Sequence, residues 1–555
     1  MRPLSCHKKP AAQQSLNLGI SLLLLISGCV NSGTEFTVQI LDESEIPTAA
    51  RIRITDMKGN YIAPEGHTVD FPMTTSGDQE PVEADVLLDE GRRFAYVDGS
   101  FSFYSASDSV RIEVVKGFHY RINDQKILLK KDDEPITINL EKAFVLPAEP
   151  WYTGDVHVHH INKESALLEM KAEDVNVTNL LISDFTLDHQ HFRGTIEPES
   201  DPEHLLFYGQ EYREDRLGHI DLLNLTKNLI EPSVEQRKHQ YPLNIDAMDK
   251  THEQGGHVSL AHFAAWPGLE GPLGIVFQKV DAVELLCTID PFHEPIFASD
   301  VVPEVRMNSG LKLWYRLLNC GFKIPVTGGT DKMGNFVTVG ANRTYALVEN
   351  EFNYVNWVEA LNEGRTFVSN SPFLSFKVDG QDPGSIINGE KERSYKITAE
   401  VWSQMPVDRL EIVANGELVA ETTITSGEKH KSLEIDYKTN KSVWITARAY
   451  QLAQRERRQG LSMAQRRNEY AGPTQLNRYY GTLRPEVSFA HTSPVYIEIK
   501  NQPIRSSVDA EYFVQYLQNA IDWLEREGSF PSDEAKQEVL TKFRLGRDQF
   551  VLLAR

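Results

Sequence analysis

The chain has 555 residues and a formal net charge of −22, with 41% hydrophobic and 25% charged residues. This length exceeds what one hydrophobic core supports, so we expect several domains. The hydrophobic and charged fractions are typical of folded globular proteins and exclude a wholly disordered chain. Because an acidic surface repels phosphate backbones, we expect no nucleic acid among the partners.

The first 28 residues have the composition of a bacterial lipoprotein signal peptide. Two lysines precede an apolar run at 16–26, which is too short to span a bilayer. The run ends in a small Ser-Gly pair directly before Cys29, an order that resembles the processing site of such signals. We therefore expect residues 1–28 to be removed and the exported protein to be anchored to a bacterial membrane by lipid on Cys29, at the periplasmic face or the cell surface. An ordinary secretory signal is the alternative.

Residues 30–150 have the pattern of a β domain. Short alternating runs, such as 36–40 and 110–114, are separated by Gly, Asp, Asn and Pro. Alternation with a period of two places one side of each strand in a core, and no helical period is visible. These features predict a small N-terminal β-sandwich.

Residues 151–375 alternate between strand-like and helical patterns. The predicted strands are 155–159, 179–182, 258–261, 282–286 and 324–327. The predicted helices, each followed by a glycine, are 245–254, 311–320 and 355–363. Such alternation is typical of a parallel α/β barrel or sheet, in which active sites lie at the carboxyl ends of the strands.

The remaining chain predicts a second β domain and then helices. Strand patterns return over 376–505, interrupted by a basic polar insertion at 454–480 in which glutamates are interleaved. A solvated surface insertion is favoured over an anion-binding or membrane-facing one. Over 506–555 apolar residues follow a helical stripe, with Asp509 as the expected N-cap and Gly528 as the stop. We expect these terminal helices to pack on an earlier domain.

Cysteine is scarce outside the signal segment and Cys29. Cys287 and Cys320 remain in the body of the chain, and an exported protein can pair two cysteines in a disulfide. Both lie in apolar surroundings, which favours two buried free thiols.

Several apolar runs of the α/β region end in residues that bind metal ions. His157 and His159 alternate with valines, so both imidazoles lie on one face of a strand and can share one ion. A single His-x-His pair is weak evidence, because many such pairs lie on surfaces by chance. The other runs, however, end in the same way, in Asp184, in Glu211 followed by His219, in His262, in Glu284 and in Asp331. Repeated placement of this kind is what a metal centre at a barrel mouth requires.

The order of these motifs resembles a known family. Gly-Asp-x-His-x-His, Ser-Asp, Gly-x-Glu with Gly-His, Ala-His and Gly-Thr-Asp are similar to the PHP (polymerase and histidinol phosphatase) metallohydrolases, and more closely to their CehA/McbA branch. Further similarity lies at 364–368, 371–372, 378–384 and 490–496, so that it covers roughly 150–550. The resemblance implies a distorted (β/α) barrel flanked by β domains, in a multidomain α/β plus β protein with terminal helices.

The resemblance also implies roles for individual residues. The implied metal ligands are His157, His159, Glu211, His219, His262 and Asp331. The two strand histidines and the last aspartate would hold one ion, the other two histidines would hold a second, and the glutamate would bridge them. Asp184 is the candidate for proton transfer or for orienting the nucleophile. Arg365 and His189 are weaker candidates for substrate contacts, and a structural salt bridge is an equal alternative for Arg365.

The chain departs from the family pattern at two positions. Phe185 and Met333 stand where many members have histidines that serve a third ion. We therefore expect one or two divalent transition ions (zinc, manganese or iron) rather than three. Lys332 would place a positive charge near the mouth, and loop histidines such as His189 could compensate for the losses.

Three functions are compatible with these observations. The first is an exported, membrane-anchored hydrolase that uses metal-activated water to cleave an ester, carbamate or amide-type bond in a small molecule or polymer fragment. The second is a PHP-type phosphoesterase, against which the missing histidines count. The third is a non-catalytic surface lipoprotein with a structural metal ion. The six-ligand set counts against it, because a structural zinc is closed by four ligands.

Overall fold

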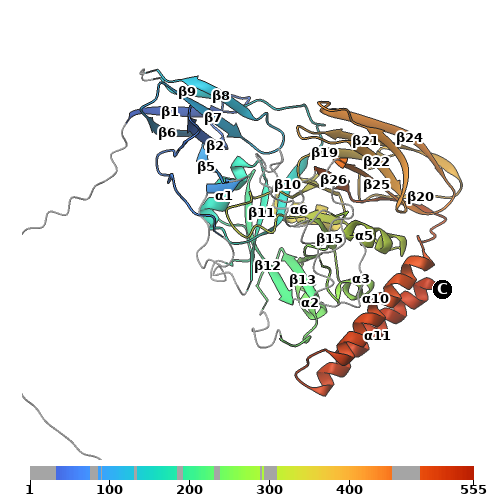
Figure 1. The fold of residues 1–555 in the computed structure, drawn as a ribbon. Coiled ribbons are helices and arrows are strands. Elements are labelled where there is room, and N and C mark those ends of the chain that lie inside the picture. The colour runs from blue at the N-terminus through green and yellow to red at the C-terminus, as the bar shows by residue number, and fades with distance from the viewer. Residues whose placement is uncertain are drawn as a thin grey trace, which may run out of the picture.

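The computed structural model describes residues 33–74, 85–88, 91–130, 134–183, 192–214, 216–229, 238–264, 266–287, 291–292, 309–452 and 488–555. These parts form a multidomain α/β plus β protein in which a central α/β unit lies between two β units, and two long helices end the chain (Figure 1). The expected signal peptide, Cys29 and the insertion at 454–480 lie outside the described residues. Across the described ranges, no helix combines the length and apolar character needed to span a membrane.

The N-terminal unit consists of two sheets that share one core. The first has the order β6–β1–β9 (Ser100–Ser105, Thr34–Leu41 and Ile136–Asn139). The second has the order β4–β5–β2–β7–β8 (Asp85–Leu88, Arg92–Asp98, Ala49–Asp56, Ser109–Val115 and Asn123–Leu128), with β3 (Tyr61–Ile62) paired to β2. Val38 and Ile40 of β1 pack in one cluster with Ile52 and Ile54 of β2, as strand alternation requires.

The central sheet positions the candidate site. In spatial order its strands are β16 (Val326–Gly328), β15 (Ala282–Leu286), β14 (His257–Leu260), β13 (Gly218–Leu223), β12 (Leu205–Glu214), β11 (Val177–Ile182) and β10 (Trp151–Val158). The pairs from β10 to β12 and from β14 to β16 are parallel, whereas β13 is antiparallel to both of its neighbours. The expectation of an all-parallel sheet is therefore wrong at β13. Only 215–217 separate this strand from β12, too few residues for a crossover.

The segment after β16 returns to β10, at the other end of this strand order. After β16, Lys332 forms a parallel bridge with Val158 at the end of β10. The backbone N–H of Asp331 donates to the carbonyl of His157 at 2.8 Å, and that of His159 donates to the carbonyl of Lys332 at 3.1 Å. The carboxyl ends of the parallel strands thus meet at one edge. Because β13 runs in the opposite direction, its amino end lies at the same edge.

Helices follow the strands of this unit, and three of them are those predicted from glycine stops. The helices are α1 (Lys163–Ala172), α2 (Asn244–His252), α3 (Gly271–Val276), α5 (Gly310–Asn319) and α6 (Tyr354–Asn362). Gly255, Gly321 and Gly364, which follow α2, α5 and α6, have φ values of 74°, 93° and 71°. Glycine adopts this left-handed backbone without steric cost, so the three predicted helix ends are confirmed.

The central sheet continues without a break into the C-terminal β unit. β17 (Arg343–Leu347) pairs with β10, and the path then runs through β18 (Thr366–Ser369), β26 (Phe489–Thr492), β25 (Val443–Tyr450), β22 (Arg409–Ala414) and β23 (Glu417–Thr423), with β27 (Val495–Ile499) and β20 (Ile386–Gly389) off this path. A further sheet contains β19 (Phe373–Val378), β21 (Arg393–Trp402) and β24 (His430–Thr439). Tyr345 and Phe367 share a core cluster with these strands, which joins the two units.

The chain ends in the helices α10 (Ser507–Arg526) and α11 (Asp533–Ala554), which lie side by side (Figure 1). Tyr516 of α10 donates to the carbonyl of Gly268 at 2.7 Å, so the predicted packing on an earlier domain is confirmed. The predicted N-cap is wrong: Ser506 caps α10 by accepting from the backbone N–H of Asp509 at 3.2 Å. Cys287 and Cys320 are buried free thiols, as expected.

Candidate metal centre

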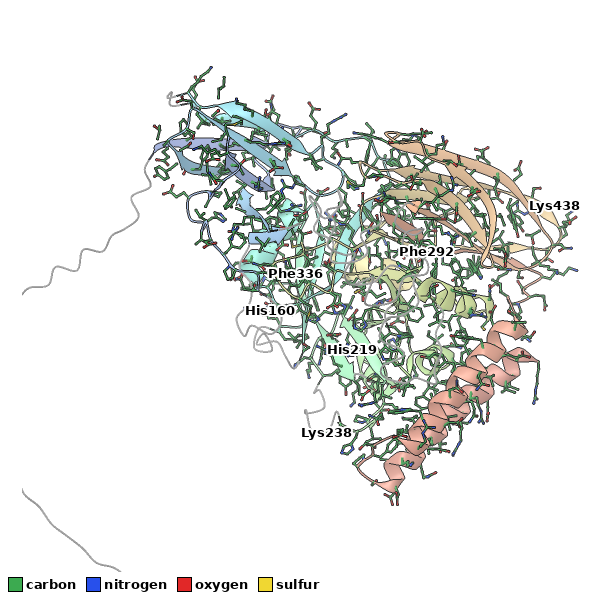
Figure 2. The ribbon with its side chains drawn as sticks, in the orientation of Figure 1. His160, His219, Lys238, Phe292, Phe336 and Lys438 are labelled. Atoms are coloured by element: carbon green, nitrogen blue, oxygen red, sulfur yellow. The ribbon has the colours of Figure 1, made fainter. Side chains whose placement is uncertain are left out.

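The six predicted metal ligands all lie at the strand edge described above. His157 is in β10 and His159 directly follows it, Glu211 is near the end of β12, His219 is the second residue of β13, His262 follows β14 and Asp331 follows β16. Figure 2 labels His219 on β13, near the middle of the molecule. The hairpin reversal explains how a residue at the start of a strand reaches the same edge as residues at the ends of the others.

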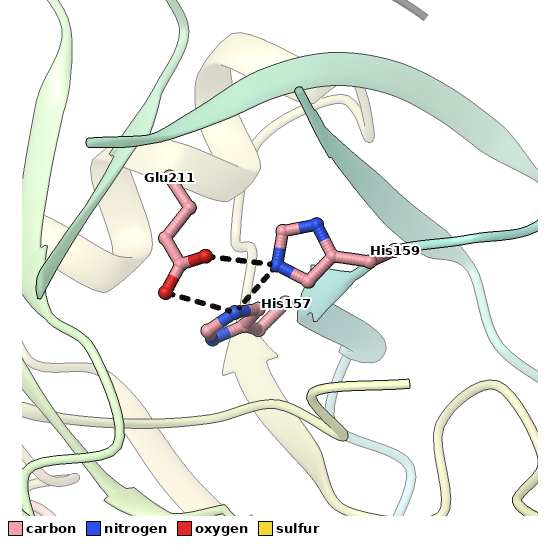
Figure 3. Close-up of side chains that lie close together, drawn as sticks. All are labelled: His157, His159 and Glu211. Atoms are coloured by element: carbon pink, nitrogen blue, oxygen red, sulfur yellow. Dashed lines mark hydrogen bonds and ion pairs between the residues drawn. The ribbon is translucent and has the colours of Figure 1, made fainter. Parts of the chain in front are cut away.

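The first group of donor atoms consists of His157, His159 and Glu211 (Figure 3). The Nε2 atoms of the two histidines are 3.0 Å apart. Oε2 of Glu211 lies 3.2 Å from Nε2 of His159, and Oε1 lies 3.8 Å from Nε2 of His157. One donor atom of each residue lies within 4.8 Å of the others, and all three residues are buried. These atoms could hold a metal ion.

The second group consists of Glu211, His219 and His262. Oε1 of Glu211 is 2.8 Å from Nδ1 of His219 and 3.5 Å from Nε2 of His262. The two imidazoles approach to 3.1 Å through the same nitrogens. Glu211 therefore belongs to both groups: Oε2 faces His159, and Oε1 faces the other three histidines.

Asp331 lies beside the first group rather than within it. Its Oδ1 atom is 3.7 Å from Nε2 of His157. Asp331 and His262 both have left-handed backbone, with φ values of 50° and 33°. For residues other than glycine this conformation carries a steric cost, and it clusters at functional sites.

Acidic side chains outnumber basic ones around these histidines. Asp221 and Glu284, which sequence reasoning had not assigned as ligands, are fully buried beside His157 and join Glu211 and Asp331 as a third and fourth carboxylate. Within the described ranges, Arg213 is the one basic side chain of the lysine or arginine type that forms an ion pair with any of these four carboxylates. Its Nε lies 3.7 Å from Glu211. Both carboxylate oxygens of Asp221 are buried without a hydrogen-bond partner in the described part of the chain.

The electrostatics follow from this crowding. Burial opposes ionisation of Glu211, but His219 and hydrogen bonds from the histidines hold its pKa well below the ordinary value. Burial also disfavours a charged His157, yet Asp221, Glu284 and Asp331 raise the pKa of its imidazole well above normal. Burial raises the pKa of Asp221 far above that of a free carboxyl, despite the opposing effect of His157.

The donor set could hold a divalent metal ion. Imidazole nitrogens and carboxylate oxygens can bind a divalent metal ion, and an excess of buried carboxylates favours binding of a cation. A search of protein-family models and of curated proteins gave no match to the chain. Function is carried by the groups in a site rather than by the fold around them.

Two further residues could have been found from the sequence. Asp221 lies two residues after His219 in β13, so strand alternation places both side chains on one face. Glu284 lies in the apolar run 282–286, at one of the apolar-to-polar junctions of the α/β region. It also belongs with His157 and Cys287 to a third group of possible donors.

Asp155 and Lys332 are buried and lie close to the ligands in the sequence, but their side chains contact groups other than the donor atoms. Asp155 accepts from the backbone N–H of Thr330 at 2.9 Å and of Gly340 at 2.7 Å, and burial raises its pKa to about 6. The expectation that Lys332 brings a positive charge to the mouth is wrong. Lys332 is buried with its Nζ 3.2 Å from Glu169, so its charge lies in a different cluster from the donor atoms.

Three other expectations concern Arg365, Asp184 and His189. Arg365 pairs with Glu363 and lies 3.8 Å from Glu349. Its backbone carbonyl bonds to Leu347, which pairs with Trp151 at the opposite end of β10 from His157. The structure does not bring Arg365 to the donor groups. Asp184 and His189 lie outside the described residues.

Proposed function

We propose that this protein is an exported, lipid-anchored metallohydrolase that cleaves an ester, carbamate or amide-type bond in a small molecule or polymer fragment. The observation that carries the proposal is that Glu211 belongs to two donor groups at once. A carboxylate placed between two sets of histidines is the arrangement that a pair of ions acting on one water requires. A closed structural zinc site uses four ligands without such sharing.

The proposal includes membership of the CehA/McbA branch of the PHP metallohydrolases. Its support is the order of the motifs along the chain together with the strand path that runs from β10 to β16 and returns to β10. All six residues that the resemblance implies as ligands lie at one edge of that path. The distorted barrel with flanking β domains is part of the same proposal.

We assign the first ion to His157 and His159 with Asp331 beside them, the second to His219 and His262, and the bridging position to Glu211. Zinc, manganese or iron held there would supply Lewis-acid chemistry that activates water for hydrolysis. Glu211 stays ionised because its pKa lies well below the ordinary value.

The exposure of the donor residues supports a direction of substrate approach in this proposal. The side chain of His157 is 0% exposed, whereas those of His219, His262 and Asp331 are 11%, 14% and 19% exposed. In this proposal a substrate approaches across these three residues, because they are more exposed than His157. Arg213, at 3.7 Å from Glu211, is placed to meet a negative group on the substrate. Asp184 remains our candidate for proton transfer.

The membrane anchor is part of the proposal. The first strand of the N-terminal β unit begins at Thr34, only five residues after Cys29. Five residues of extended chain span less than ~18 Å, so lipidation at Cys29 would hold this unit against the membrane surface. The central unit would then face the exported compartment.

Metal analysis and a substrate panel test the function together. We expect one to two transition ions per purified chain and chelator-sensitive cleavage of aryl esters or carbamates. Preferential cleavage of phosphate monoesters would favour a phosphoesterase instead, and a chain without metal would favour a non-catalytic lipoprotein. His157→Ala should lose both metal and turnover. His252→Ala, a half-buried histidine that pairs with Asp281 at 2.9 Å outside the site, is the matched control.

A further inference from the structure

The ring of His157 lies between two different sets of groups. Its Nε2 atom faces His159, Glu211 and Asp331, the donors discussed above. Its Nδ1 atom faces two carboxylates instead: Oε2 of Glu284 at 3.3 Å and Oδ2 of Asp221 at 3.4 Å. The side chains of His157, Glu284 and Asp221 are all 0% exposed.

These neighbours decide which ring nitrogen is free to bind. A carboxylate only accepts hydrogen bonds, so the proton of a neutral His157 belongs on Nδ1, where it donates to Glu284. Nε2 then presents its lone pair to the donor group on the other side of the ring. A ligand histidine held by a carboxylate through its second nitrogen has a fixed orientation and a more basic donor atom.

Glu284 also contacts the second donor group. The same oxygen, Oε2, accepts a hydrogen bond from the backbone N–H of His262. One carboxylate oxygen thus connects a side chain of the first group with the backbone of a ligand in the second. Movement of Glu284 would disturb both groups at once.

The space around Glu284 leaves it little freedom. A Cβ atom on Gly329 would lie 2.4 Å from Oε1 of Glu284 and 2.6 Å from Cβ of His157. The segment that leads to Asp331 therefore packs directly against both side chains. A side chain at position 329 would clash with both residues, so glycine is required there. Glu284 is therefore confined between Gly329 and His157.

We propose that Glu284 and Asp221 are positioning residues that hold His157 with Nε2 toward the ions, and that Glu284 in addition couples the two donor groups. This inference rests on the proposed metal centre. Glu284 provides the hydrogen bond, and Asp221 provides the second negative charge beside Nδ1. Neither residue binds an ion, which separates this role from the geometric alternative in which Glu284 and Cys287 are ligands.

The test measures zinc affinity of the metal-free, full-length chain in detergent, by competition with a chromophoric chelator. We expect Glu284→Ala to weaken binding ~100-fold and Glu284→Gln, which keeps an accepting oxygen, to weaken it ~10-fold. Asp221→Asn should also weaken binding, with an unchanged number of ions. Glu270→Gln is the matched control. Glu270 is a buried carboxylate that accepts hydrogen bonds from the backbone N–H groups of Asn244 and Ile245, each at 2.8 Å, and neither residue is a proposed ligand.

The outcomes distinguish the inference from the function on which it rests. Wild-type protein that binds zinc and cleaves substrate, with unchanged affinity in both Glu284 variants, overturns the inference alone. Equal weakening in Glu270→Gln overturns it too, as does loss of one whole ion in Glu284→Gln or Cys287→Ala. Wild-type protein that binds no ion removes the proposed function and this inference together. If Glu284→Ala fails to fold by circular dichroism, Glu284→Gln and Asp221→Asn decide the question.

Discussion

Two buried clusters of charge lie on opposite sides of one short segment, and they are balanced differently. Asp331 points to the candidate metal centre, while the next residue, Lys332, points into a cluster between α1 and the N-terminal β unit. In this second cluster Lys332 pairs with Glu169 at 3.2 Å, and Arg51 pairs with Glu173 at 2.6 Å. Each acid there has a cation from the chain itself.

The metal centre lacks this internal balance. Its four carboxylates share one arginine contact within the described residues, at 3.7 Å. Burying charge without a partner costs several kcal/mol, so a cluster of this kind requires protons or a cation from outside. The comparison teaches that a buried charged cluster alone does not identify a site. The site is the cluster whose charges the chain leaves uncompensated.

The largest expected effect comes from breaking the balanced cluster. Lys332→Met leaves Glu169 buried without its cation, and removing one partner of a buried pair costs about 3–5 kcal/mol. We expect this loss in the free energy of unfolding measured with urea. The loss should be the same in the presence of zinc and in the presence of a chelator, because Lys332 faces away from the donor atoms. Lys312→Met, on the exposed side of α5, should change stability by less than about 0.5 kcal/mol. A loss that appears only with zinc would contradict the separation of the two clusters.

A buried histidine beside the balanced cluster gives a second test, through pH. Burial lowers the pKa of His119 to about 4, and its Nε2 lies 3.0 Å from the hydroxyl of Tyr345. Its contribution is complete above the unfolded pKa of about 6.5 and is lost as pH falls toward 4, because only the unfolded chain takes up the proton. Stability should therefore fall by up to about 3 kcal/mol over this range. Over the same pH range, the stability of His119→Gln should fall by up to about 3 kcal/mol less than that of the wild type. An equal fall in both proteins would show that His119 is charged in the folded protein.

Metal removal should affect only the uncompensated cluster. At a free zinc concentration of 100 times Kd, binding to the folded state stabilises it by about 2.7 kcal/mol. We expect the unfolding midpoint to fall by the corresponding amount in chelator for the wild type and for Lys332→Met. The difference should disappear in His157→Ala. A chain whose stability is the same with and without zinc would falsify the metal centre.

Much of the site was predictable because its signals are local. Strand alternation placed His157 and His159 on one face, and apolar runs that end in polar residues located the remaining ligands at the strand ends. Glycine stops fixed the ends of three helices for the same reason, since a left-handed residue is a property of one position. Convergence at one edge then followed from the parallel pairs.

The missed features depend on contacts between distant segments. The direction of β13 is set by a tight connection to β12, which alternation cannot reveal. The side to which Lys332 points is set by a single bridge to Val158, some 170 residues earlier in the sequence. Asp221 shares a strand face with His219, but its role depends on a contact with the distant His157. Pairing partners, rather than strand propensity, determine these three features.

The smallest expected effect concerns Arg365, the weaker substrate candidate. Its side chain pairs with Glu363 near the surface, at the end of β10 that lies away from His157. The distance along β10 from Trp151 to His157 is six residues, or roughly 20 Å, too far for one side chain to contact substrate at the donors. Arg365→Ala should leave KM and zinc affinity within twofold and lower stability by at most about 1 kcal/mol, as expected for a surface ion pair. A tenfold rise in KM for an anionic substrate, with normal zinc affinity, would instead give Arg365 the substrate role and extend the site beyond the strand edge.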